Sequence, residues 1–531
     1  MLFWGVWMSP GGPELSGPGL FVPATTLGPS HAARQDLSVC GAARWGFDWT
    51  ARSGTIRPML TIDYTNCLSD VVGSHGVDAA LIGPGSPGAK AIAHHTARLE
   101  ATRNTGWERW RGLISEPARG EHIRAVRAAV ATCRGRFETM VVLGIGGSAL
   151  GNIALQAALN PPTWNLLTPE ARKGSPRMFV IDNVDPDHFG AVMDLCNAQP
   201  GGLKATLFNV VSKSGETAET AAQFMIIREM LRQAIGPNYA ANIVAITDPA
   251  KGTMRQICDR EKFTTLPVPD GVGGRFSVLS PVGLFSAAMC GIDIAALLEG
   301  AAAMDQRCSN PEISRNPAAM LAYLLVELGT RQGKPNHVMM PYSNALYLLA
   351  DWYRQLWAES LGKQKDLSGE TVFAGFTPIK ALGATDQHSQ VQLYREGPND
   401  KVIGMVEVTE FARDVPVPTG LGVDALHYLE GASLGGLLNA EKRATEYALN
   451  ESQRPNYTIR FPKIDAAHVG EFIMLWQVTT AYAGLLLNVD AYDQPAVETG
   501  KQATFGLMKR KGYEKHLIAV TSSLGGARSI I

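Results

Sequence analysis

The sequence predicts an α/β fold in which two lobes are built on mainly parallel sheets. Short apolar runs alternate with helical patterns, and this alternation begins again near residues 334–343. Turns rich in glycine or in hydroxyl groups follow two of the apolar runs. Strands that alternate with helices form parallel sheets, and the helices cover both faces of such sheets. A chain of 531 residues is also long enough for about two to four domains.

The hydrophobic pattern assigns each element in turn. Short apolar runs rich in β-branched residues predict strands, and apolar residues at three- and four-residue spacing predict helices. In the first lobe, strands are expected at 139–145, 177–183, 205–213 and 241–248, and helices at 148–159, 217–235 and 280–292. In the second lobe, we expect strands at 334–343, 389–397 and 401–408, a long helix at 344–360, and a helical tail from about Leu421.

The chain divides into five segments. Residues 1–58 are rich in proline and glycine and contain no lysine, so we expect them to be disordered or absent from the native protein. Two alternatives stay open for them: a flexible or transit-like tail, or an over-extended start with the true protein opening at Met59. The other segments are a helical region (59–109), the first lobe (110–300), the second lobe (301–490) and a helical tail (491–531).

The composition excludes several classes of protein. Hydrophobic residues make up 45% of the chain, charged residues 18%, and the formal net charge is -1. This balance gives no electrostatic footprint for nucleic acid or for an anionic membrane surface. No run of about 18 uncharged apolar residues exists, so we expect no membrane span. Seven scattered cysteines without a C-x-x-C pair indicate reduced thiols and a cytoplasmic protein.

A glycine-rich turn follows the first predicted strand. The stretch "GIGGSA", Gly144 to Ala149, has the G-x-G-x-x-A form of a dinucleotide-binding loop. That fingerprint needs an acidic residue about 20 residues further on, but the next strand ends at Asp182. No Lys-Ser or Lys-Thr pair follows the loop, so it is not a triphosphate-binding loop either. A turn that uses glycine only for tight packing remains the alternative.

A second loop favours a smaller phosphorylated ligand. In "NVVSKSGETAET", hydroxyl groups at Ser212, Ser214 and Thr217 accompany the charge of Lys213 at the start of a helix. Ser214 is expected to cap that helix, where backbone N–H groups and the helix dipole attract anions. An ordinary capped helix is the alternative. Two such loops on neighbouring strands predict a phosphate site at the carboxyl edge of the sheet.

Six ordered motifs extend this pattern: "LGIGGSALG", "SKSGET", "GGRFSVLSPVG", "WAESLGKQ", "GATDQHSQ" and "DQPAVETGKQ". From Met59 onward, the chain resembles the glucose-6-phosphate isomerase (phosphoglucose isomerase) family of SIS-domain sugar isomerases. The resemblance implies two SIS-type three-layer α/β/α lobes with helical extensions at both ends. It also implies the reversible isomerisation of D-glucose 6-phosphate to D-fructose 6-phosphate, in glycolysis and gluconeogenesis, by ring opening and proton transfer through a cis-enediol(ate).

Glu359 and Arg275 are candidates for the central chemistry, because aldose–ketose isomerisation needs a base and a group that stabilises the enediolate. Glu359 closes a predicted helix with Gly362 as its expected cap, and the negative end of the helix dipole there disfavours an ionised carboxylate. Arg275 follows two glycines that allow close backbone approach. A surface glutamate and a structural arginine are the alternatives. The resemblance makes Glu359 the acid/base and assigns Arg275 to transition-state stabilisation.

The resemblance also supplies two further catalytic residues. His388, expected just before a strand, matches a family histidine that assists ring opening from the partner subunit, which implies an obligatory homodimer. Lys501, on a helix expected to start near Asp493 with Gln494 and Glu498 on the same face, matches a catalytic lysine. An exposed loop histidine and a solvated helix face are the alternatives. Substrate contacts carry over to Gly147, Ser148, Ser212, Lys213, Ser214, Thr217 and Gln494.

We expect neither a metal nor a cofactor, because proton transfer needs none and the eleven histidines form no ligand motif. The expected partner is a small-molecule hexose 6-phosphate, and neither nucleic acid nor a membrane. Three other functions are compared with this one, and only the first stays open, because no N-terminal cysteine nucleophile supports the second and the presence of Glu359, His388 and Lys501 argues against the third. They are an isomerase of mannose 6-phosphate, an enzyme that transfers amide nitrogen to fructose 6-phosphate, and a regulator that binds sugar phosphates without a catalytic base.

Overall fold

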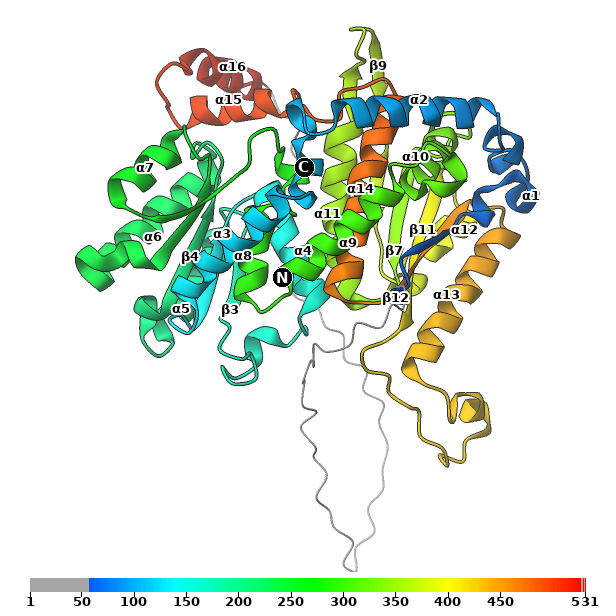
Figure 1. The fold of residues 1–531 in the computed structure, drawn as a ribbon, viewed down its shortest axis with the longest axis horizontal. Helices are drawn as coiled ribbons and strands as arrows, with labels where there is room; N and C mark the ends of the chain where they lie inside the picture. Colours follow the sequence, from blue (N-terminus) through cyan, green and yellow to red (C-terminus); the bar gives the residue numbers. More distant parts are fainter. Residues whose placement is uncertain (1–56, 527–528, 530) are drawn as a thin grey trace, which may run out of the picture. The chain divides into compact units, whose positions relative to one another are not determined.

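The computed structural model describes residues 57–526, 529 and 531. Nearly all of the proline- and glycine-rich segment 1–58 therefore lies outside the described residues. The described chain forms two five-stranded sheets, a short two-stranded ribbon and the helices around them (Figure 1). The fold class is α/β with mainly parallel sheets, as the sequence predicts.

The first sheet has the strand order β3-β2-β4-β5-β6, and all its neighbours are parallel. Its strands are β2 (Thr139–Leu143), β3 (Arg177–Ile181), β4 (Thr206–Val211), β5 (Ile243–Thr247) and β6 (Thr264–Pro267). Apolar side chains of α5 (Pro186–Ala198), α6 (Ala218–Ile235) and α7 (Thr253–Glu261) cover one face. Those of α3 (Ala118–Cys133), α4 (Leu150–Leu159) and α8 (Pro281–Met289) cover the other. This is a three-layer lobe, and the four predicted strands of this lobe are confirmed.

The second sheet has the order β1-β12-β11-β7-β10, in which only β1 is antiparallel to its neighbour. Its strands are β1 (Thr61–Asp63), β7 (Asn336–Pro341), β10 (Thr377–Lys380), β11 (Lys401–Glu410) and β12 (Asn456–Lys463). The ribbon consists of β8 (Lys363–Lys365) and β9 (Thr371–Ala374). Side chains of α12 (Val391–Glu396) and α13 (Leu434–Glu451) cover one face of this sheet. Those of α10 (Pro317–Thr330), α11 (Tyr347–Leu361) and α14 (Ala466–Leu486) pack on the other.

Helices account for most of the remaining structure. Their bounds are α1 (Ser69–Val72), α2 (Pro87–Thr102), α3 (Ala118–Cys133), α4 (Leu150–Leu159), α5 (Pro186–Ala198), α6 (Ala218–Ile235), α7 (Thr253–Glu261), α8 (Pro281–Met289), α9 (Ile294–Arg307), α10 (Pro317–Thr330), α11 (Tyr347–Leu361), α12 (Val391–Glu396), α13 (Leu434–Glu451), α14 (Ala466–Leu486), α15 (Val497–Leu507) and α16 (Glu514–Leu524).

Helices α11 and α14 lie side by side between the two sheets (Figure 1). Nearly every residue of α14 is buried, and an all-round apolar helix of this kind belongs in the interior of a protein. One continuous hydrophobic core runs from the first sheet through these helices to the second. Among residues 57–526, no helix has the length and hydropathy that crossing a membrane would require.

Two sequence predictions for the second lobe are wrong. Residues 389–397 do not form a strand, because Val391–Glu396 is a helix that buries Tyr394 and leaves Leu393 exposed. The tail after Leu421 is not entirely helical either, since β12 pairs with both β1 and β11. β1 itself lies in the segment 59–109 that was expected to be helical. β1 and α12 span only three and six residues. Over so few residues, the two-residue period of a strand cannot be told apart from the 3.6-residue period of a helix.

The first described residues contact α14, which bears on the expectation that residues 1–58 are disordered or absent from the native protein. Arg57 forms an ion pair with Glu471, whose side chain is 0% exposed. The backbone N–H of Leu60 donates to the same carboxylate at 2.8 Å, and the carbonyl of Pro58 lies 2.9 Å from Nε2 of His468. Residues 57–60 are thus part of the folded protein.

We expect Arg57→Ala to lower the free energy of unfolding by about 1–3 kcal/mol, because it leaves a buried carboxylate with fewer partners. Urea denaturation followed by tryptophan fluorescence measures this change. The double variant Arg57→Ala, Glu471→Gln should recover part of the loss. A single variant with wild-type stability would show that the ion pair does not stabilise the fold.

Candidate functional site

The carboxyl ends of β2, β4 and β5 meet at one edge of the first sheet, where the three following loops surround a cavity. The cavity has a volume of about 590 Å³, within the range of small-molecule sites. Its lining residues are Ile145, Ser148, Val211, Ser212, Lys213, Ser214, Thr217, Thr220, Asp248, Lys251, Gly252, Gln494 and Lys501. The structure therefore brings together seven of the residues that the sequence assigned to the site.

The loop that follows β4, residues 212–217, presents hydroxyl groups to this cavity. The backbone N–H of Gly215 donates to Oγ of Ser212 at 3.0 Å, and that of Glu216 donates to Oγ of Ser214 at 3.1 Å. Each hydroxyl is used here as an acceptor, so its own O–H can still donate to an anion. We call residues 212–217 the phosphate loop.

The expected helix cap in this loop is wrong by three residues. Helix α6 begins at Ala218, and its N-cap position is Thr217, whose side chain makes no capping hydrogen bond. Ser214 instead lies in the turn before the helix, where Gly215 has a φ of +77°. A Cβ on Gly215 would lie 2.3 Å from the backbone nitrogen of Met254, so a tight approach to α7 requires glycine.

The glycine-rich turn after β2 serves as a contact with a second loop. Gly147 lies in a 3-10 turn, Gly146–Ser148, directly against Gly274. A Cβ on Gly147 would come within 2.2 Å of the carbonyl carbon of Gly274. This close approach places the backbone that carries Arg275 beside the end of β2, and Ser148 faces the cavity.

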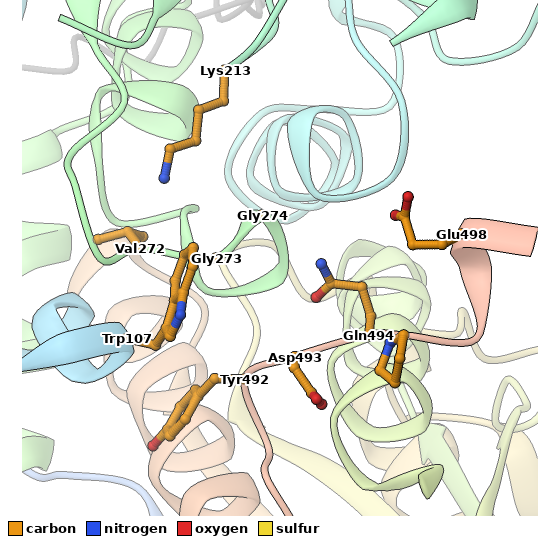
Figure 2. Close-up of a pocket in the computed structure, with 10 residues that line it drawn as sticks. Trp107, Lys213, Val272, Gly273, Gly274, Tyr492, Asp493, Gln494 and Glu498 are labelled. Carbon is orange, nitrogen blue, oxygen red and sulfur yellow. The ribbon is translucent and has the colours of Figure 1, made fainter. Parts of the chain in front are cut away.

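A second cavity of about 390 Å³ shares Lys213 and Gln494 with the first. Figure 2 shows Lys213 extending toward Trp107, with Gln494 and Glu498 on the opposite side. The ammonium of Lys213 lies 5.1 Å from the centre of the Trp107 indole, a cation–π distance. Trp107 is half exposed and was missed by the sequence analysis, because nothing in its local pattern separates it from an ordinary surface tryptophan.

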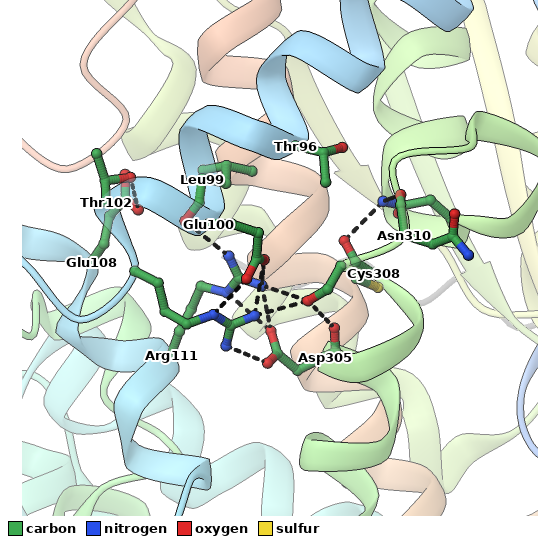
Figure 3. A network of polar contacts seen from close by, with 12 residues as sticks. Thr96, Leu99, Glu100, Thr102, Glu108, Arg111, Asp305, Cys308 and Asn310 are labelled. Atoms are coloured by element: carbon green, nitrogen blue, oxygen red, sulfur yellow. Dashed lines mark hydrogen bonds and ion pairs between the residues drawn. The ribbon is translucent and has the colours of Figure 1, made fainter.

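A buried network of charges anchors the 3-10 segment Gly106–Ile114 that carries Trp107 (Figure 3). Arg111, which is 1% exposed, donates to Asp305 of α9 at 2.8 Å and to Glu100 of α2 at 3.0 Å. Arg103 donates to the other oxygen of Asp305 at 2.6 Å. Breaking a buried pair of this kind leaves an uncompensated charge, so the network holds this wall of the site in place.

Arg275 connects the segments that form the other side of the site. It is 3% exposed and donates to Glu359 Oε1 at 3.3 Å, to Gln494 Oε1 at 2.9 Å, and to Ser360 Oγ at 2.7 Å. Its Nη2 also donates to the carbonyls of Ala491 and Asp493 at 2.7 and 3.1 Å. Burial lowers the pKa of the Arg275 guanidinium, while Glu359 and Asp493 act in the opposite direction. The guanidinium nevertheless remains charged.

Glu359 lies in the last turn of α11, and Gly362 is the C-cap, as expected. Its carboxylate accepts a hydrogen bond of 2.9 Å from Nε2 of Gln355, one turn earlier. Gln355 in turn lies beside Gly146, since a Cβ there would be 3.1 Å from Nε2 of Gln355. Glu359 is therefore connected through Gln355 to the turn that follows β2, but it is not among the residues that line either cavity. Gln355 was missed in the sequence, although its spacing of four residues from Glu359 signals a shared helix face.

The end of α11 carries positive charge that the helix-dipole argument had left out. Lys363 is buried, and its ammonium donates to the carbonyls of Glu359, Ser360 and Asp493 at 2.8, 2.9 and 3.0 Å. Burial and the nearby Arg275 lower the pKa of this lysine. Lys363 and Arg275 thus offset the negative end of the helix dipole beside Glu359.

The C-terminal candidates lie on less regular backbone than expected. α15 begins at Val497, so Gln494 precedes the helix and does not share a helix face with Lys501. Both residues still line the larger cavity, and Lys501 forms an ion pair of 2.7 Å with Glu498. The amide oxygen of Gln494 accepts from Arg275, which leaves its NH₂ group available to the cavity.

His388 stands apart from these residues. It ends the 3-10 turn Thr385–His388 before α12, its side chain is exposed, and it lines neither cavity.

In the part of the chain that the structure describes, no three histidine, cysteine or acidic side chains come together in a way that could hold a metal ion.

Comparison with known proteins identifies the family. The sequence model described as phosphoglucose isomerase matches residues 120–413, more than half of the chain. The chain belongs to the phosphoglucose isomerase family. It is 43% identical to the glucose-6-phosphate isomerase of Rubrobacter xylanophilus over 86% of this chain and 99% of that protein. It is 44% identical to that of Carboxydothermus hydrogenoformans over 74% of this chain and 84% of that protein.

A solved structure supports the same assignment of the fold. The crystal structure of hypothetical protein TT0462 from Thermus thermophilus matches this phosphoglucose isomerase family member with a TM-score of 0.72 and 34% sequence identity. The match covers 85% of this chain and 100% of that protein. The two lobes described above are therefore an architecture that a crystal structure also contains.

Proposed function

We propose that this protein interconverts D-glucose 6-phosphate and D-fructose 6-phosphate. The observation that carries the proposal is the contact of Glu359 with Arg275 beside a cavity lined by the phosphate loop. A base next to a buried guanidinium suits a reaction in which a carbon acid loses a proton and negative charge develops on oxygen. Membership of the phosphoglucose isomerase family supports the same reaction.

The substrate's phosphoryl group binds the phosphate loop in this proposal. Ser212, Ser214 and Thr217 supply hydroxyl donors and Lys213 supplies positive charge, as all four line the cavity. Gly147 and Ser148 contact the sugar, and Gln494 bridges it to Arg275. Fixing the phosphoryl group at one end holds the reacting carbons near Glu359, and such positioning lowers the entropic part of the barrier.

Glu359 then moves the proton. After ring opening, its carboxylate takes the proton from C2 of the aldose and returns it to C1, with a cis-enediolate between the two steps. Arg275 stabilises the negative charge that this intermediate carries on oxygen. Lys501, which lines the cavity, acts at the sugar ring, and His388 assists ring opening from the partner subunit of a homodimer.

The dimer in this proposal is supported by what the single chain leaves exposed. His388 is exposed and lines neither cavity, and it precedes α12, where Leu393 is 53% exposed. Other apolar side chains are exposed on the ribbon and on the segment before α13, among them Phe373, Leu421 and Tyr428. A second chain that covered these side chains would remove their apolar surface from water, which favours association.

The reaction is tested by incubating the purified protein with fructose 6-phosphate. A coupled dehydrogenase that is specific for glucose 6-phosphate reports the product through NADPH absorbance. A parallel assay with mannose 6-phosphate as substrate, in which a second coupling enzyme detects the product, tests the alternative that the protein is a mannose 6-phosphate isomerase. Turnover of mannose 6-phosphate alone, or no turnover of either sugar, would overturn the proposal.

Complementation between two inactive variants tests the shared site. We expect His388→Ala and Glu359→Gln each to be inactive alone. After the subunits are mixed and exchanged, hybrid dimers contain one site with an intact Glu359 and an intact partner histidine, so up to about half of the dimer's sites become functional. Exchange without any return of activity would place His388 in its own chain's site or outside the chemistry.

A further inference from the structure

The last two helices form a hairpin that carries Lys501 to the larger cavity. The rings of Phe505 on α15 and Tyr513 before α16 lie 5.1 Å apart and close this hairpin. Most of its side chains are exposed, including those of Leu507, Met508 and Ile518. The hairpin therefore has little apolar burial to fix its position, although one of its residues faces the substrate cavity.

One ion pair connects this hairpin to the phosphate loop. Nη2 of Arg510 donates to Oε2 of Glu216 at 2.9 Å, and the other oxygen of Glu216 accepts from the hydroxyl of Thr253 at 3.2 Å. Among the described residues, no other side-chain hydrogen bond or ion pair joins residues 497–524 to the rest of the chain. Arg510 lowers the pKa of the Glu216 carboxyl, so the pair is charged at neutral pH.

The guanidinium of Arg510 is itself held in place by the hairpin. It lies over the ring of Phe505 at 4.5 Å and over that of Tyr513 at 5.5 Å. Cation–π contacts of this length restrict the side chain. The two aromatic rings of the hairpin thus orient Arg510 toward Glu216.

We propose that Arg510 is a positioning residue that holds the C-terminal hairpin on the phosphate loop and thereby places Lys501 at the substrate. Glu216 lies between Ser214 and Thr217, so its ion pair with Arg510 connects the hairpin directly to the loop that is proposed to bind the phosphoryl group. The inference rests on the proposed function for what Lys501 does. The connection between hairpin and loop is a separate claim and has its own test.

Kinetics give the first test. We expect Arg510→Ala to lower kcat by about two- to fivefold, the range set by an exposed ion pair, while KM for fructose 6-phosphate changes less. Glu216→Gln should have the same effect, and the double variant should be no worse than either single one. Arg510→Lys should restore part of the loss. Lys509→Ala, which removes the same charge from the neighbouring exposed residue, is the control and should leave kcat unchanged.

Hydrogen–deuterium exchange without substrate gives the second test. Amides of residues 497–524 should exchange faster in Arg510→Ala and Glu216→Gln than in the wild type or Lys509→Ala, with the global Tm unchanged. Equal exchange in all four proteins, or kinetic losses that add in the double variant, would overturn the inference. A wild-type protein that fails to turn over fructose 6-phosphate would overturn the proposed function instead, since exchange reports the connection alone.

Discussion

Glu359→Gln should lower kcat for fructose 6-phosphate by about 10²–10⁴-fold, the contribution of a positioned general base. The substitution keeps the size of the side chain, and the amide oxygen can still accept from Arg275, which donates to Glu359 at 3.3 Å. What it removes is the group that takes the proton. The coupled dehydrogenase assay measures the loss at saturating substrate.

Binding separates this loss of chemistry from a loss of structure. We expect calorimetry to show that Glu359→Gln binds fructose 6-phosphate with nearly the wild-type Kd, because the residues of the phosphate loop are untouched. Glu370→Gln, at an exposed glutamate in the turn between β8 and β9, is a matched control and should keep full activity. If Glu359→Gln kept nearly full turnover, another group would have to be the base.

Arg275→Lys should lower kcat/KM by about 10²–10³-fold, as the removal of one preorganised donor to developing charge does. Lysine keeps the charge but has three donors on a flexible stem, so it cannot reproduce the fixed fork that contacts Glu359, Gln494 and Ser360 together. The coupled assay over a range of substrate concentrations measures this ratio.

The surface arginine Arg109 supplies the control for this variant. It forms an exposed ion pair of 2.7 Å with Asp270, on the loop that leads to Arg275. Arg109→Lys should change kcat/KM by less than about twofold, since exposed pairs contribute little. Equal losses in both variants would mean that the loop as a whole, and not the Arg275 guanidinium, matters for the reaction.

The sequence predicted the first lobe well and the second lobe less well, for a physical reason. Strands β2, β4 and β5 are buried on both faces and therefore appear as continuous apolar runs between long helices. In contrast, β12 stands between two long helical patterns, and α12 spans six residues. A helix and a strand cannot be told apart by period over so few residues.

The candidate site was predictable wherever a motif carried it. Ser212, Lys213, Gln494 and Lys501 come together from distant parts of the chain at one cavity. The sequence did not predict the roles of Lys363 and Trp107, because these depend on contacts with residues far away in the chain, Asp493 and Lys213 respectively. The sequence likewise predicted the negative end of the α11 dipole beside Glu359, but not the ammonium of Lys363, which donates to the carbonyls of Glu359 and Ser360 and offsets it.

The contacts of Arg275 have a consequence for the order in which the protein matures. Its partners lie 84 to 219 residues further along the chain, and the last of them is Gln494. A nascent chain leaving the ribosome can assemble the first sheet early, since domains generally fold as they emerge. Arg275 lacks several of its partners until residues 491–494 have also left the ribosome, so its full set of contacts forms later than the first sheet.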